Sequence, residues 1–114
     1  MELEQLENLI LEKNRWLTAK LSEQRGLIKT AAEAERTYRI ELAKATLLEK
    51  GKGTPATLNR DVVRGQKFIA DLKFDRDVSK GINDACREAI RACLGALNSI
   101  QSLVGIERAK INLR

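Results

Sequence analysis

The sequence contains no histidine and is poor in proline and aromatic residues, with one Pro, one Trp, one Tyr and two Phe among 114 residues. The lack of histidine removes the commonest general base of enzymes and a frequent metal ligand. No serine or cysteine stands in a recognisable nucleophile motif. Four aromatic side chains also supply little apolar area for a compact core. These absences predict a protein that is not an enzyme, holds no metal ion and uses no cofactor.

Cysteine is nearly absent as well, with only Cys86 and Cys93, seven residues apart. On one helix this spacing separates two Cα atoms by about 10 Å, which is too far for a disulfide between them. Without histidine or a CxxC pair, a zinc site is also disfavoured. We therefore expect both thiols to pack as small apolar side chains in a reducing compartment.

Two kinds of apolar segment are missing from the pattern. No run of about eighteen apolar residues that could span a bilayer is evident, and no basic and then apolar stretch resembles a secretion signal. We therefore expect no membrane partner and a location in the cytoplasm.

Strand-like alternation is absent too, whereas apolar residues recur at three- and four-residue steps over most of the chain. This pattern predicts a long helix over residues 1–49, a short elbow helix over 54–65, a second long helix over 66–105 and a tail over 106–114. The first helix either continues through Gly26 or bends there. The expected fold is all-α, a single domain built as an antiparallel helical hairpin with a short elbow helix.

The first predicted helix carries a long heptad-like apolar stripe. Its members are Leu3, Leu6, Ile10, Leu17, Leu27, Ala31, Ala34, Tyr38, Ala45 and Leu48, interrupted by Lys13, Lys20, Gln24 and Glu41. A second apolar set widens the stripe and comprises Leu9, Trp16, Leu21 and Ile28. Such a stripe on a chain with little compact core predicts that copies associate into an oligomeric helical bundle. Another protein is the alternative partner for this surface.

The segment between the long helices concentrates hydroxyl, amide and guanidinium groups. Thr54 before Pro55 is typical of an N-cap followed by the first helical residue. Gly51 is typical of the C′ residue that follows a helix, and Gly65 of the left-handed residue that ends one. A helix N-terminus offers free N–H groups and a partial positive charge to an anion. The pattern predicts a ligand site made of Thr54, Thr57, Asn59, Arg60 and Arg64, assisted by Lys73 and Arg76.

These residues also have purely structural interpretations. The threonines can cap the short helix, and the arginines can form surface ion pairs with Asp61, Asp71 or Asp75. Trp16 and Tyr38 can stack on a nucleobase, although aromatic residues on an apolar helix face usually pack in a core.

The net charge of +5 lies entirely in the second half of the chain. Residues 1–50 hold nine basic and nine acidic side chains, whereas residues 51–114 hold twelve and seven. A basic surplus favours phosphate-bearing partners. Aspartates interleave with the cations, which favours a discrete pocket over a continuous track for a polyanion. The expected function is therefore to bind and sequester a small phosphorylated ligand such as a nucleotide. A DNA- or RNA-binding accessory role and protein–protein interaction are the alternatives.

Several segments resemble small helical proteins encoded by tailed phages and prophages. The resemblance rests on Tyr38 and on the segments Gly53–Gly65, Leu72–Val78, Ala89–Ile90 and Ile100–Leu103. It implies a phage or prophage origin and a role in the cytoplasm of the infected bacterial host. A nucleotide signal of bacterial defence is then the kind of phosphorylated ligand to expect.

Overall fold

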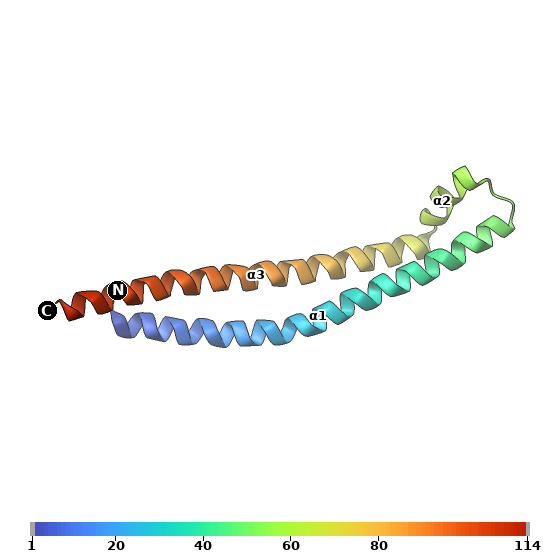
Figure 1. Ribbon diagram of the computed structural model, residues 1–114. Coiled ribbons are helices and arrows are strands. Elements are labelled where there is room, and N and C mark those ends of the chain that lie inside the picture. The colour runs from blue at the N-terminus through green and yellow to red at the C-terminus, as the bar shows by residue number, and fades with distance from the viewer. Residues whose placement is uncertain (1, 114) are drawn as a thin grey trace. The chain divides into compact units, whose positions relative to one another are not determined.

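The computed structural model describes residues 2–113, and this part of the chain forms three α-helices and no strand (Figure 1). Helix α1 spans Leu3–Gly51, α2 spans Ala56–Arg64 and α3 spans Lys67–Asn112. The all-α prediction is confirmed. Tertiary contacts divide the chain into two units, to which both α1 and α3 contribute. The terminal unit comprises Met1–Arg25 and Asp84–Arg114, and the central unit comprises Gly26–Asn83.

The observed helices begin and end within two residues of the predicted bounds, except at the end of α3. α1 is continuous through Gly26 and ends at Gly51, two residues beyond the predicted end. The predicted tail from residue 106 instead continues α3 as far as Asn112. Beyond Gly105 the sequence contains neither proline nor glycine, so nothing in it breaks the helix.

In the terminal unit, the first part of α1 packs antiparallel against the last part of α3 (Figure 1). The core of this unit joins Leu6 of α1 to Ile100 and Val104 of α3. Leu3, Leu9 and Ile10 pack around these three side chains. The apolar stripe predicted for the first long helix therefore packs on α3 here.

Both cysteines lie in the same interface and are free and buried, as expected from the sequence. The sulfur of Cys93 lies 3.8 Å from the carbonyl oxygen of Lys13, and that of Cys86 lies 3.9 Å from the carbonyl oxygen of Lys20. Residue numbers fall along α3 as they rise along α1, as an antiparallel pair requires. Within residues 2–113, no group of three or more Cys, Asp or Glu side chains could hold a metal ion.

α3 is more apolar than the sequence pattern suggested. It contains an 18-residue window with a mean hydropathy of 1.3, long and apolar enough to cross a membrane by length and composition alone. The stretch 89–106 carries a single charged residue, Arg91. The expectation that the chain has no such run is therefore wrong. A mostly buried core helix meets the same criterion, but only 28% of this window is buried inside the protein.

In the central unit, α2 packs onto α1 and the start of α3. Its core joins one residue from each helix, namely Tyr38, Val63 and Ile69. Leu42, Ala45 and Leu72 pack around them. This small core fixes the position of α2 beside the last turns of α1.

The predicted stripe on α1 changes at its C-terminal end. Leu48 is 71% exposed, whereas the neighbouring Glu49 is buried. Glu49 accepts a hydrogen bond from the Thr54 hydroxyl at 2.9 Å and pairs with Lys52 at 3.6 Å, which satisfies its charge. The four polar interruptions of the stripe, Lys13, Lys20, Gln24 and Glu41, are half-buried. Their aliphatic stems can therefore continue the seam.

Candidate functional site

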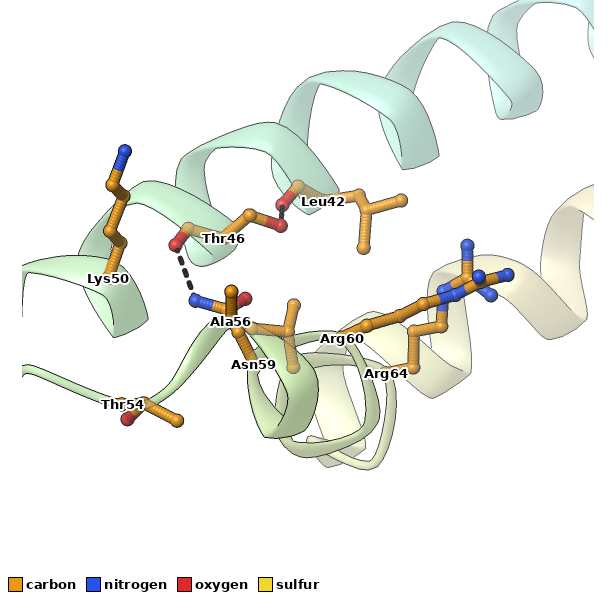
Figure 2. Close-up of a pocket in the computed structure, with 9 residues that line it drawn as sticks. Leu42, Thr46, Lys50, Thr54, Ala56, Asn59, Arg60 and Arg64 are labelled. Atoms are coloured by element: carbon orange, nitrogen blue, oxygen red, sulfur yellow. Dashed lines mark hydrogen bonds between the residues drawn. The ribbon is translucent and has the colours of Figure 1, made fainter.

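A pocket of about 440 Å³ lies in the central unit between the end of α1 and α2 (Figure 2). Its lining side chains are Leu42, Thr46 and Lys50 from α1, Thr54 from the loop, and Ala56, Asn59, Arg60, Val63 and Arg64 from α2. The volume is within the range of small-molecule sites.

Asn59 fixes α2 against α1 at the back of this pocket. Its side chain is 7% exposed, and its Nδ2 donates to the carbonyl oxygen of Thr46 at 3.3 Å. The Thr46 hydroxyl in turn donates to the carbonyl oxygen of Leu42 at 2.7 Å. The Oδ1 of Asn59 is buried and accepts no hydrogen bond from any residue that the structure describes. An unsatisfied buried acceptor lowers the stability of the folded protein. This oxygen is therefore available to accept a hydrogen bond.

Three cations line the pocket without carboxylate partners. Arg60 and Arg64 lie one turn apart on α2 and extend in the same direction, whereas Lys50 lies toward the other end of the view (Figure 2). Within residues 2–113, none of the three forms an ion pair. Neighbouring like charges repel each other, and a bound anion would relieve that repulsion.

The N-terminus of α2 differs from its predicted form. The residue before the helix is Pro55, with φ −56° and ψ 142°, and no described side chain caps the first turn. The prediction that Thr54 is the N-cap is therefore wrong, because its hydroxyl donates to Glu49 instead. The first-turn N–H groups of α2 consequently lack a side-chain acceptor.

The glycines around α2 also play roles other than the predicted ones. Gly65 follows α2 in a right-handed conformation, with φ −79° and ψ −11°, and not in the left-handed one expected. A Cβ at Gly65 would lie 3.2 Å from the carbonyl oxygen of Asp61, so the close approach favours glycine there. The left-handed turn is made by Gly53, with φ 84°, while Gly51 ends α1 as a helical residue.

The structure brings four of the seven predicted site residues together. Thr54, Asn59, Arg60 and Arg64 line the pocket, whereas Thr57, Lys73 and Arg76 do not. Thr57 and Lys73 are exposed on α2 and α3.

Arg76 instead belongs to a separate cluster in the central unit. Its guanidinium lies 4.5 Å from the centroid of the Tyr38 ring and pairs with Glu35 at 3.4 Å and Asp77 at 3.0 Å. Tyr38 is buried beneath it, so this aromatic ring packs in the core.

The contribution of α1 to the pocket was not predicted from the sequence. Leu42, Thr46 and Lys50 stand at four-residue steps and therefore lie on one face of the helix. That spacing marks a common face, but it does not show that α2 folds onto it.

One side chain near α2 has a shifted pKa. The pKa of Lys67 is raised because its ammonium donates to Asp71 at 2.6 Å and is attracted by the carboxylate charge. Both groups are exposed and lie outside the pocket. Lys67 and Asp71 therefore pair with each other and do not contribute their charges to the pocket.

The pocket combines a positively charged part with an apolar wall. Leu42, Ala56 and Val63 supply the wall, and the lining residues include no Asp, Glu or Cys. Such a site can hold an anion that also carries an apolar or aromatic group. No protein family, curated protein or solved structure matches this chain.

Proposed function

We propose that the pocket beside α2 binds a small phosphorylated ligand without altering it. The observation that carries this proposal is the set of cations Lys50, Arg60 and Arg64, which line one pocket without a carboxylate among its lining residues. Guanidinium groups bind phosphate oxygens through charge-assisted and often bidentate hydrogen bonds. The uncapped first turn of α2 adds backbone donors near the same site.

The apolar wall favours an organic phosphate over inorganic phosphate. A nucleobase or similar flat group could lie against Leu42, Ala56 and Val63 while the phosphate meets Arg60 and Arg64. From the resemblance to phage proteins we further propose that this binding takes place in the cytoplasm of an infected bacterium. Sequestration of a nucleotide signal of bacterial defence is the role that follows.

Calorimetry with linear and cyclic nucleotides tests this proposal. Arg60→Ala and Arg64→Ala should each weaken binding by roughly ten- to a hundredfold, the usual worth of a charge-assisted contact. Arg36→Ala is the matched control, because Arg36 is exposed in the same unit and lies outside the pocket. This variant should bind as the unmodified protein does.

Three results would contradict the proposal, each in a different way. A nucleoside that binds as tightly as its nucleotide would show that the pocket does not recognise the phosphate. Recovery of a cleaved nucleotide would show an enzyme. Binding of long oligonucleotides alone, with affinity falling steeply as salt rises, would favour a nucleic-acid accessory factor.

The protein surface supports the further proposal that copies of the chain associate. A compact chain of 12.8 kDa exposes about 6,300 Å². This chain exposes 8461 Å², including many large apolar side chains. The difference exceeds the roughly 800 Å² that each partner buries in a typical stable interface. Association would remove much of this apolar surface from water.

A further inference from the structure

In the terminal unit, α3 carries a second stripe of small and apolar residues beside the one that packs on α1. This small-residue face consists of Ala85, Ala89, Ala92, Ala96, Ser99, Leu103 and Ile106, at alternating steps of four and three. Each of these residues is at least partly exposed. A helix with two adjacent heptad stripes can pack against two other helices. In the terminal unit, however, the described chain supplies α1 alone as a neighbour.

Gly95 borders this face and, like Gly81 and Gly105 in the same helix, has open space beside its Cα. A Cβ there would meet no described atom within 4 Å, although glycine is among the poorest helix formers. A glycine beside alanines permits the close approach of another helix backbone. The nearby Ser99 hydroxyl donates to the Gly95 carbonyl oxygen at 3.3 Å. The face can therefore become buried without leaving this hydroxyl unpaired.

A groove of about 460 Å³ runs along the face. Ala89, Ala92 and Ala96 form one side of it, and Leu9 and Trp16 of α1 form the other. A groove between two helices with apolar walls is suited to a third helix.

The edge of the groove carries one charge of each sign, from Glu12 and Lys13. Neither residue forms an ion pair with any part of the chain that the structure describes. In a two-fold symmetric interface the same edge meets itself, so each side chain can find its opposite on the other copy.

We propose that the small-residue face is where a second copy of this chain docks, with its helix lying in the groove. This inference rests on the association proposed above and assigns a surface to it. Residues 89–106 carry one charge, Arg91, so docking buries little charge. The chain exposes more surface than a compact protein of its mass, and the excess is larger than the area that one partner buries in a typical interface. In addition, the opposite charges of Glu12 and Lys13 at the groove edge can pair with those of a second copy. The phosphate pocket lies in the other unit and does not depend on this surface.

Sedimentation analysis of Gly95→Leu tests the assignment. A leucine at Gly95 should block close packing and weaken association on the order of ten- to a hundredfold. The helix itself should persist, because leucine is a better helix former than glycine. Ala92→Glu, which places a charge on the face, should act in the same direction.

Gly26→Leu is the matched control, because a Cβ at Gly26 in α1 also meets no described atom within 4 Å. It should assemble as the unmodified protein does. An unmodified protein that stays monomeric at high micromolar concentration overturns the association as well as its surface. Unchanged assembly of Gly95→Leu overturns the surface alone. A monomer that floats with phosphatidylcholine and phosphatidylglycerol vesicles would identify lipid as the occupant and end the proposal.

Discussion

At the scale of single residues, Arg76 shows how a cation can serve the core and not a ligand. Its guanidinium lies over the buried Tyr38 ring and between the carboxylates of Glu35 and Asp77. A planar guanidinium can stack on the ring while it donates from its edge, which a lysine ammonium cannot do. Arg60, in contrast, is exposed and pairs with no described carboxylate, so its charge is free for an anion.

We therefore expect Arg76→Lys to change stability and Arg60→Lys to change nucleotide affinity. Arg76→Lys should lower the free energy of unfolding by about 0.5–2 kcal/mol, because an ammonium cannot stack on the Tyr38 ring and also donate to both carboxylates, and should leave nucleotide affinity unchanged. Arg60→Lys should leave the free energy of unfolding within about 0.5 kcal/mol and weaken nucleotide binding. Urea denaturation and calorimetry measure the two quantities. A loss of affinity in Arg76→Lys at unchanged stability would return Arg76 to the ligand site.

At the scale of elements, the connection between α1 and α2 determines where the pocket forms. α1 continues through Gly51, and the chain reverses at Gly53, whose φ of 84° is in the left-handed region. The turn places Thr54 where its hydroxyl reaches Glu49, and Asn59 then joins α2 to the Thr46 carbonyl. Adding a side chain should therefore affect stability differently at Gly51 and at Gly53.

Alanine substitutions at these glycines should change stability in opposite directions. Gly53→Ala should destabilise the protein by ~1–2 kcal/mol, because an L-residue is strained at positive φ. Gly51→Ala should be neutral or stabilising by up to ~1 kcal/mol, because Gly51 is helical and no described atom lies within 4 Å of the added Cβ. Thermal or urea unfolding of both variants measures the difference. Destabilisation by Gly51→Ala alone would place the left-handed turn at Gly51, as the sequence pattern suggested.

At the scale of the whole molecule, a large apolar surface remains outside the two small cores. Among the described residues, the buried apolar side chains are Leu6, Cys86, Ile90, Cys93, Leu97, Ile100 and Val104 in the terminal unit and Tyr38, Val63 and Ile69 in the central unit. Exposed apolar side chains occur in both units, with Phe74 and Leu47 of the central unit and Leu11 of the terminal unit each more than half exposed. Such small cores give limited stability to an isolated chain, and association is the common remedy.

If association contributes to stability, the melting temperature should depend on protein concentration. A tenfold increase adds about 1.4 kcal/mol to the apparent stability of a two-chain assembly, which corresponds to a shift of roughly 3–5 °C at this size. Circular dichroism melts at three concentrations measure this shift, and Gly95→Leu should reduce it. A melting temperature independent of concentration would show that the single chain carries the full stability.

The sequence by itself determined the helical class, the approximate extent of each helix and the apolar stripe by which α1 packs on α3. These features follow from local periodicity and from the positions of glycine and proline, which the chain displays directly. Only the tertiary structure decided which face of α1 meets α2. In that packing, Thr46 and Lys50 line the same pocket as Arg60 and Arg64, whereas Arg76 stacks on the Tyr38 ring. It also decided that the left-handed turn falls at Gly53. The spacing of residues along a helix fixes which of them share a face, whereas contacts between segments depend on how the separate faces pack together.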